Sequence, residues 1–390
     1  MRARLVACAV VVLALVPAAP AAAARPKKVP SNFVGTVADG PLLENPNVDL
    51  AGQLGRMVTN GVQTLRTVFN WAGAQPYKTF NDVPMDQRDR FRDENGVPTD
   101  YSKIDELVTA AAERRIAVLP IVMIAPMWDA RHPGQLSSPP QDFQPYYDFA
   151  AAVARRYGPG GSFWSEHPEL VAQPIRYWQI WNEPSFKVFW SDQPFATDYV
   201  ELLRGARDAI RAVDPGARIV LAGLANKSWT ALSKIYKAGG GPLFDVAAFH
   251  PFTDKVDGVR QILVHDRQVM AGNGDARKPL WVTELSWTSA KGKTSVTYGN
   301  EQTERGQARR LAAAYTMLAK QRRKLRIGRV YWYTWVTPDK QRDYPFDWAG
   351  LLRVTSGGVK AKPALGAFRR TTLALEHCRT KRGRADRCAS

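Results

Sequence analysis

Metal-binding and redox-active side chains are scarce in this sequence. Three cysteines and five histidines occur in 390 residues. The histidines are scattered, and neither they nor the cysteines show the spacing that metal ligands need. The sequence therefore predicts no metal ion and no other cofactor.

Signatures of phosphate and nucleic-acid binding are also missing. Gly272-Asn273-Gly274 is only a fragment of a glycine-rich phosphate turn, and it lies on the wrong side of a helix. The sequence has no nucleophile elbow and no known nucleic-acid motif. A linker, a low-complexity tract and an appended module are absent too. We therefore predict one domain and no nucleic-acid partner.

The charge is strongly biased toward basic residues. The formal net charge is +18, which is compatible with an anionic partner or with a solvated basic exterior. The basic residues are dispersed until the tail, Arg379 to Arg387. This tail is basic enough to touch an anionic polymer or a membrane surface, but we expect a solvated, disordered end.

The N-terminus has the pattern of an export signal. Arg2 and Arg4 precede an unbroken apolar run, Leu5–Val16, and Ala22–Ala24 offers a small-residue cleavage site. A membrane anchor is the alternative, but two prolines interrupt the stretch and its apolar part is too short for a bilayer of about 30 Å. We predict a secreted, extracellular protein without a stable membrane anchor.

Two cysteines remain after residues 1–24, the predicted signal peptide. Cys378 and Cys388 lie close together in a chain that we expect to be exported, which predicts a small disulfide loop. The alternative is two free thiols in a frayed tail. We predict a single domain over residues 25–376, followed by a basic C-terminal tail at 377–390 that contains the disulfide.

Short β-rich runs alternate with helical segments along the whole chain. Alternation of this kind is typical of a parallel sheet with helical crossovers, and one run, Val118–Ile124, is apolar throughout, as expected for a strand buried on both faces. The eight runs are Asn32–Thr36, Gln63–Phe69, Ile116–Ile124, Ile175–Trp181, Arg218–Gly223, Phe244–His250, Pro279–Leu285 and Gly328–Trp335.

Apolar residues at helical spacing fill the segments between these runs. Eight β/α units in a chain of this length predict an α/β fold, a single-domain (β/α)8 barrel; an open doubly wound sheet is the alternative. The apolar stripes are Leu50, Leu54 and Met57; Ile104, Leu107, Val108 and Ala111; Tyr199, Leu203, Ala206, Ile210 and Val213; Ile262, Val269 and Met270; Ala308, Leu311, Tyr315 and Leu318; and a closing helix near Pro363–Leu375.

Two glutamates follow strands of the predicted barrel, where functional groups of such barrels collect. Glu183 ends the fourth strand and Glu284 ends the seventh. A pair of facing carboxylates is what the cleavage of a glycosidic bond requires. Retention of configuration needs a separation of about 5–5.5 Å, whereas inversion needs roughly 6.5–9.5 Å. Structural ion pairs are the alternative for both residues.

The chain resembles the superfamily of retaining (β/α)8 glycoside hydrolases that carry the acid/base on strand four and the nucleophile on strand seven. It is most similar to the cellulase-like and β-xylosidase/iduronidase-like families. The resemblance extends over the region after the signal peptide. Asn182-Glu183-Pro184 matches the strand-four motif, which implies that Glu183 is the acid/base and that Asn182 binds the sugar 2-hydroxyl. Thr283-Glu284 matches the strand-seven pair, which implies that Glu284 is the nucleophile.

The resemblance implies three further site residues. Arg66 matches an arginine of strand two that keeps the nucleophile ionised, His250 matches a histidine of strand six, and Trp335 matches a tryptophan of strand eight under the sugar. Arg66 lies in an apolar strand, so it must meet a carboxylate, either Glu284 or a structural partner. A hydrogen-bonded core histidine would give the same pattern at His250.

One position departs from the family pattern. These families often carry a tyrosine two residues after the strand-six histidine, whereas this chain has Phe252. The hydroxyl that would touch the nucleophile is therefore missing. Arg66 alone can keep the nucleophile ionised, or one of three tyrosines can replace the hydroxyl: Tyr298, Tyr331 or Tyr333.

Tryptophans are concentrated near the predicted strand ends. Sugars offer flat C–H faces that stack on aromatic rings, although most tryptophans are simply packed. We predict sugar contacts for Trp335 and also for Trp71 and Trp287. Trp128, Trp181 and Trp190 share these positions, whereas Trp178, Trp281 and Trp332 follow the strand pattern and are expected in the core.

These features predict a secreted retaining glycoside hydrolase. It would cleave a β-glycosidic bond in an oligo- or polysaccharide through a glycosyl-enzyme intermediate. A catalytically silent carbohydrate-binding protein on the same barrel and a transglycosylase are the alternatives. The basic composition makes an anionic glycan or a cell-wall polymer a candidate partner. The sequence leaves the sugar, the linkage, endo or exo attack and the oligomeric state open.

Overall fold

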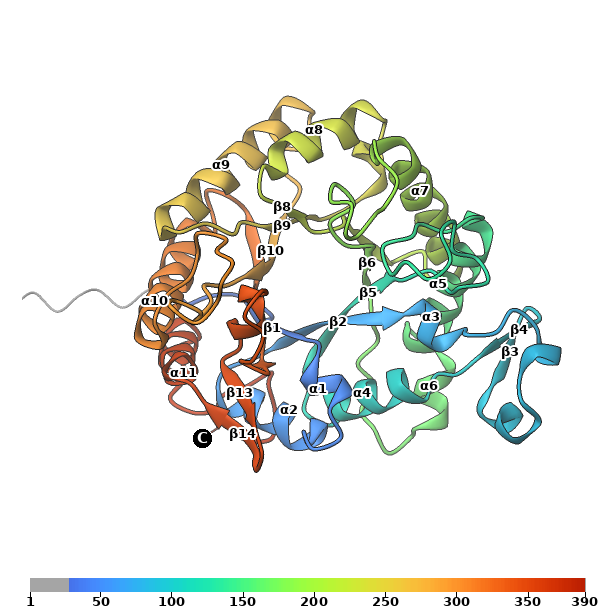
Figure 1. Cartoon of the computed structure of the whole chain (residues 1–390), viewed down its shortest axis with the longest axis horizontal. Coiled ribbons are helices and arrows are strands. Elements are labelled where there is room, and N and C mark those ends of the chain that lie inside the picture. The colour runs from blue at the N-terminus through green and yellow to red at the C-terminus, as the bar shows by residue number, and fades with distance from the viewer. Residues whose placement is uncertain (1–27, 390) are drawn as a thin grey trace, which may run out of the picture.

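A ring of parallel strands forms the centre of the molecule, and helices surround it (Figure 1). The computed structural model describes residues 28–389, so the predicted signal peptide at 1–24 lies outside the described residues. The strands of the ring are β1 (Val34–Ala38), β2 (Thr64–Asn70), β5 (Ala117–Met123), β6 (Tyr177–Ile180), β7 (Arg218–Val220), β8 (Leu224–Ala225), β9 (Ala247–His250), β10 (Leu280–Leu285) and β11 (Ile327–Trp332).

The two outermost strands of the sheet belong to one short segment, and this closes the ring. The strand order is β7-β6-β5-β2-β1-β11-β10-β9-β8. β7 pairs with β6 and β8 pairs with β9, and Val220 also bridges to Val246 just before β9. Together β7 and β8 therefore form the fifth strand of an eight-stranded barrel. The predicted (β/α)8 barrel is confirmed, and each predicted β-rich run overlaps a strand.

The described residues form eight longer helices, which cover the outside of the barrel (Figure 1). The predicted stripes lie on six of them. No stripe was predicted for α5 or α8, although each buries an apolar face, with Phe149 and Val153 on α5 and Leu232 and Ile235 on α8. The eight helices are α2 (Leu50–Thr59), α4 (Ser102–Glu113), α5 (Phe143–Tyr157), α7 (Ala196–Val213), α8 (Ser228–Lys237), α9 (Val256–Gly272), α10 (Glu304–Gln321) and α11 (Pro363–Leu375).

The predicted buried face of α9 was partly wrong. Ile262 and Val269 are only half-buried, whereas Val259, Leu263 and Asp266 are fully buried. Asp266 can lie inside because it accepts a hydrogen bond from the Ser228 hydroxyl of α8, at 2.8 Å. Sequence patterns assign an aspartate to the exposed face of a helix, because carboxylates are rarely buried. Asp266 therefore shifted the predicted buried face of α9 away from the observed one.

Shorter elements lie in the connections, and one group of them contributes to the site described below. The group is a three-stranded sheet of β12 (Val336–Thr337), β13 (Leu352–Thr355) and β14 (Gly358–Ala361), which follows β11 together with the 3-10 helix Pro345–Trp348. The others are α1 (Pro41–Glu44), α3 (Trp71–Ala74), α6 (Ser162–Glu166), the hairpin of β3 (Arg92–Glu94) and β4 (Val97–Thr99), and the 3-10 helices Phe80–Asp82, Met85–Arg90 and Gly241–Leu243.

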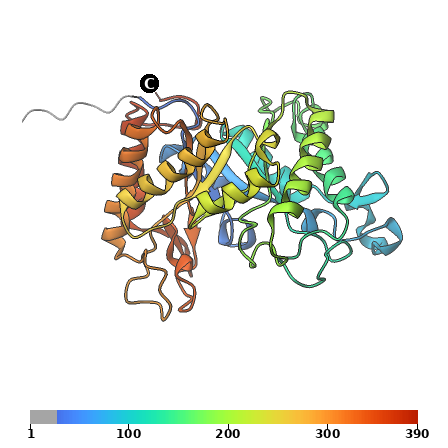
Figure 2. The same cartoon turned by 90° about the horizontal axis from the view of Figure 1, so that it is seen from above.

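The C-terminal tail packs against the barrel, so its expected disorder is wrong for the described residues. Cys378 and Cys388 form a disulfide. Lys381 is 1% exposed and forms an ion pair with Glu376, which makes its burial possible. Ala385 is fully buried. In Figure 2 the C-terminus lies at one end of the barrel, and long loops extend from the other end.

Among the helices of residues 28–389, none combines the length and the apolar character needed to cross a membrane.

Candidate active site

A cavity of about 710 Å³ opens where the barrel strands end and the following loops begin. Residues within β2, and residues at or near the ends of β1, β5, β6, β8, β9, β10 and β11 or in the loops after them, line it. Both predicted catalytic residues, Glu183 and Glu284, are among them, as are Asn182 and Arg66. Side chains from distant parts of the chain therefore meet in one cavity.

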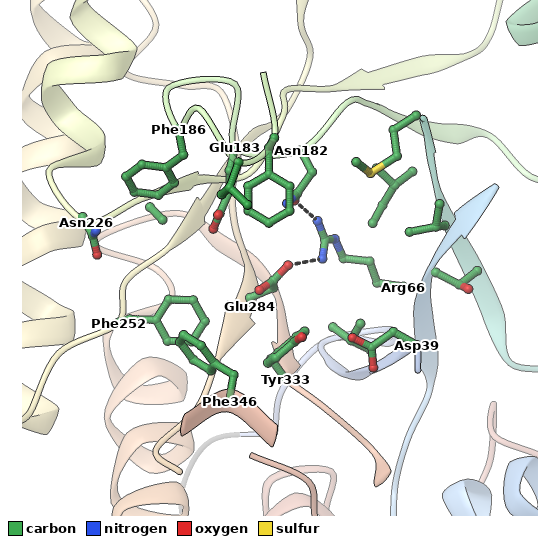
Figure 3. A pocket seen from close by; sticks show the side chains of 18 of the residues that line it. Asp39, Arg66, Asn182, Glu183, Phe186, Asn226, Phe252, Glu284, Tyr333 and Phe346 are labelled. Carbon is green, nitrogen blue, oxygen red and sulfur yellow. Dashed lines mark hydrogen bonds and ion pairs between the residues drawn. The ribbon is translucent and has the colours of Figure 1, made fainter. Parts of the chain in front are cut away.

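Glu183 and Glu284 face each other across this cavity (Figure 3). One carboxylate oxygen of Glu183 lies within 4.8 Å of one of Glu284. Glu183 is 7% and Glu284 is 9% exposed. The short separation is compatible with the spacing that retaining enzymes use, about 5–5.5 Å between carboxyl groups, and is shorter than the roughly 6.5–9.5 Å of inverting enzymes.

The Arg66 side chain connects three strands at the floor of the cavity. Its Nη1 donates to Oε1 of Glu284 at 2.6 Å, and its Nη2 donates to Oδ1 of Asn182 at 2.7 Å (Figure 3). Its Nε donates to Oε1 of Gln179, also at 2.7 Å. Arg66 is 1% exposed, and a guanidinium so deeply buried needs such partners. The arrangement holds Glu284 in place and leaves the Asn182 amide nitrogen able to donate to a ligand.

His250 is fully buried and contacts the first glutamate directly. Its Nδ1 lies 2.5 Å from Oε1 of Glu183, and its Nε2 lies 3.0 Å from the Thr283 hydroxyl. Gly223 makes room for the ring, because a Cβ at that position would lie 1.9 Å from Nε2. Burial lowers the pKa of His250 to about 3, so the imidazole is neutral at physiological pH. His250 is therefore placed to orient Glu183.

The two glutamates have different electrostatic surroundings. Burial raises the pKa of Glu183 to about 8, since desolvation penalises the carboxylate. Burial also raises the pKa of Glu284, but the Arg66 guanidinium in direct contact opposes this rise. A carboxyl group with a strongly raised pKa, Glu183, beside a carboxyl group that a guanidinium contacts, Glu284, is the combination expected of a general acid and a nucleophile.

The raised pKa of Glu183 predicts a pH-dependent effect on stability. The folded-state pKa of Glu183, about 8, exceeds the ordinary value of 4.5. Its contribution to the free energy of unfolding is therefore fully present below pH 4.5, and it falls by about 1.4 kcal/mol per pH unit as the pH rises toward 8. We expect Glu183→Gln to melt above the wild type at pH 8 and level with it near pH 4.5, as measured by calorimetry. The exposed control Glu169→Gln should not reproduce this trend, and a pH-independent difference would contradict the prediction.

The predicted sugar contacts of Trp335, Trp71 and Trp287 are wrong. All three side chains are fully buried and none lines the cavity. β11 ends at Trp332 and the chain then turns, so Tyr333 enters the cavity and Trp335 packs behind it. The three indole nitrogens donate hydrogen bonds within the protein, to Gln53, Gln75 and the Asp254 carbonyl.

Tyr333 is the tyrosine that lies beside the second glutamate. Of the three candidates for the missing hydroxyl, Tyr331 pairs with the Thr64 hydroxyl inside the barrel at 3.0 Å, and Tyr298 lies half-exposed at the mouth. Tyr333 lies next to Glu284 (Figure 3) and its hydroxyl hydrogen-bonds with Asp39. Burial raises the pKa of Tyr333, so it stays protonated and can donate.

Several cavity residues escaped the sequence analysis, and Asp39 and Phe346 show why. Asp39 directly follows β1, so the rule that functional groups follow barrel strands could have found it. Phe346 lies in the 3-10 helix after β12, and no local pattern marks it. Four aromatic rings surround it, with centroids 4.9 to 6.0 Å away: Phe252, Tyr298, Tyr333 and Tyr344.

The same centre contains the one group of potential metal ligands found among the described residues, namely Glu183, His250 and Glu284. The Arg66 guanidinium already neutralises Glu284 at 2.6 Å and would repel a cation there. The donor set therefore does not fit a metal ion, and the absence of a cofactor stays a prediction.

Known structures share this fold. A β-xylosidase from Caulobacter crescentus aligns with a TM-score of 0.58 and 19% identity, over 89% of this chain and 68% of that chain. A glucosidase from Croceicoccus marinus aligns with a TM-score of 0.63 and 16% identity, over 90% of this chain and 68% of that chain. An α-L-arabinofuranosidase from Thermotoga maritima aligns with a TM-score of 0.57 and 14% identity, over 91% of this chain and 72% of that chain. No model of a protein family and no curated protein matches the chain. By its strand order and by these similarities, the chain has a (β/α)8 barrel fold, which it shares with these three structures.

Proposed function

We propose that this chain is a retaining glycoside hydrolase that cleaves a β-glycosidic bond by double displacement. The observation that carries the proposal is the pair of buried carboxyl groups, Glu183 and Glu284, within 4.8 Å of each other in one cavity. The fold shared with glycosidases of several specificities supports it.

The two glutamates divide the chemistry between them. Glu183, protonated, donates its proton to the leaving oxygen while a carboxylate oxygen of Glu284 attacks the anomeric carbon. The glycosidic bond breaks and a glycosyl ester of Glu284 forms. Glu183, now ionised, takes a proton from water, whose oxygen attacks the anomeric carbon and releases Glu284. Each residue thus ends the cycle in the protonation state in which it began.

Three neighbours position this pair. Arg66 stabilises the ionised form of Glu284, and the neutral His250 orients Glu183. Arg66 holds the amide oxygen of Asn182, so the amide nitrogen of Asn182 can donate to the sugar 2-hydroxyl. Hydrogen bonds to this hydroxyl strengthen in the transition state of glycoside hydrolysis.

The cavity lining favours an uncharged glycone. Beside the protonated Glu183, two acidic residues, Asp39 and Glu284, line it against one basic residue, Arg66. A uronic acid or sulfated sugar would meet net negative charge there. The basic composition, which suggested an anionic glycan, therefore belongs to the exterior and not to the site. We propose export on the basis of the N-terminal sequence, and the disulfide is of a kind common in exported proteins.

A panel of aryl β-glycosides tests the proposal, with the anomer formed first followed by proton NMR. We expect hydrolysis of at least one glycoside and initial release of the β-anomer. Initial release of the α-anomer would overturn the retaining mechanism. An inert wild type that still binds glycans would favour a silent carbohydrate-binding protein, and transfer products in excess sugar acceptor would favour a transglycosylase.

A further inference from the structure

The cavity wall differs on the two sides of the glutamates. In Figure 3, Arg66 and Asp39 lie to one side of Glu284, and the aromatic rings of Phe186, Phe252 and Phe346 lie to the other. The first side offers the charged groups of Arg66 and Asp39 to a sugar, whereas aromatic rings dominate the second side. The two ends of a bound glycoside would therefore meet different chemistry.

The loop that carries the acid also carries part of the apolar side. Phe186, Val188 and Phe189 follow Glu183 within six residues, and all three line the cavity. The backbone N–H of Phe186 donates to the Glu183 carbonyl at 2.9 Å, and that of Phe189 donates to the Phe186 carbonyl at 2.9 Å. These turns hold the apolar side chains close to the acid. Because the acid protonates the leaving oxygen, the leaving group must lie against this loop.

Several apolar side chains at the mouth are exposed to water. Val188 is 68% exposed, Tyr298 is 51% exposed and Tyr344 is 42% exposed, and all three line the cavity. Exposed apolar surface that is continuous with a buried apolar wall is typical of a binding surface. Tyr298 and Phe252 both pack on Phe346, with centroid distances of 5.6 and 4.9 Å, so this apolar surface extends from the mouth into the cavity.

Several polar side chains line the cavity beside these rings. They are Asn226, Thr253, Asn300 and the hydroxyl-bearing rings of Tyr298, Tyr333 and Tyr344. A second sugar would bring several hydroxyls, and each that loses water without finding a partner costs about 1–3 kcal/mol. An aromatic or long-chain alcohol needs no such partners and gains from burial. A leaving group of that kind matches the aromatic part of this wall, formed by Phe186, Phe252 and Phe346.

We infer that the leaving group of the natural substrate is an apolar aglycone, an aromatic or long-chain alcohol, and not a second sugar. The inference rests on the proposed function and deepens it. Such a substrate differs from the oligo- or polysaccharide that the sequence suggests, because only the glycone side of the cavity would bind a sugar.

Three substrates with the glycone that reacts best in the aryl panel test this inference: the octyl β-glycoside, the corresponding β-linked disaccharide and the β-glycosyl fluoride. We expect kcat/KM for the octyl glycoside to exceed that for the disaccharide by about tenfold or more. An alkoxide is a poorer leaving group than a sugar hydroxyl, so such a preference must come from binding. A preference for the disaccharide would overturn the inference while leaving the glycosidase function intact. No hydrolysis of any of the three would overturn the proposed function itself.

A substitution at the apolar mouth gives a second measurement. Val188→Asn, at a side chain that is 68% exposed, should fold, and it should lower the ratio of kcat/KM for the octyl glycoside to that for the fluoride by about tenfold. Met85→Asn is the matched control, since Met85 is 86% exposed and does not line the cavity, and it should leave the ratio unchanged. An unchanged ratio in Val188→Asn would contradict an apolar leaving-group site.

Discussion

Glu284→Gly is expected to lower kcat on the best aryl glycoside by at least about 10⁴-fold, because no other carboxylate can attack the anomeric carbon from the same position. Arg66 fixes Glu284 Oε1 at 2.6 Å, whereas Glu183 contacts the His250 ring. Asp39 contacts Thr334 and Tyr333. Neither acid is free to move into the place of Glu284.

Chemical rescue separates a lost nucleophile from a damaged fold. Azide, which fits the space of the missing carboxylate, should restore turnover of Glu284→Gly and produce the α-glycosyl azide. An activated 2-deoxy-2-fluoro glycoside should label wild-type Glu284, as peptide mass spectrometry can show. Glu169→Gly, at a side chain that is 64% exposed, is the control and should retain full activity. A label on Glu183 or on any other residue would refute the assignment.

Glu183→Gln should produce a loss that depends on the leaving group. The octyl glycoside needs a proton on its leaving oxygen, so we expect kcat/KM to fall by about 10²–10⁴-fold. The β-glycosyl fluoride needs little protonation, so its glycosylation step should be nearly unaffected. Glutamine keeps the size of the side chain and its contact with His250, which isolates the loss of the proton from a change in packing.

The pH profile gives an independent reading of the same residue. Because Glu183 must be protonated and its pKa is about 8, wild-type kcat/KM on the octyl glycoside should fall above about pH 8. This fall of kcat/KM at alkaline pH should be missing in Glu183→Gln, whereas Glu169→Gln should keep the wild-type pH profile. Equal losses on the octyl glycoside and the fluoride, or an alkaline limb retained in Glu183→Gln, would show that Glu183 is not the acid.

Predictions from the sequence succeeded where a signal is local. An apolar run such as Val118–Ile124 can only be a buried strand or helix, and its length and flanking turns favour the strand that is found as β5. Glu183 and Glu284 follow such strands, and parallel strands of a barrel present their ends on one rim. Arg66 in an apolar strand required an acidic partner, which is Glu284.

Predictions failed where the answer depends on long-range packing. Trp335 and Tyr333 lie two residues apart, and only the turn after β11 decides that Tyr333 enters the cavity. Asp266 and Lys381 look like surface residues, but partners on other elements allow them to be buried.

The sequence by itself thus determined the alternation of strands and helices and the presence of two acids at strand ends, because these depend on periodicity along the chain. Only the tertiary structure decided which aromatic side chains face the substrate and that the two sides of the cavity differ in polarity. Phe186 and Phe252 come from two loops and Phe346 comes from a 3-10 helix. The packing of these three segments over the barrel, not their local sequence, brings the rings together.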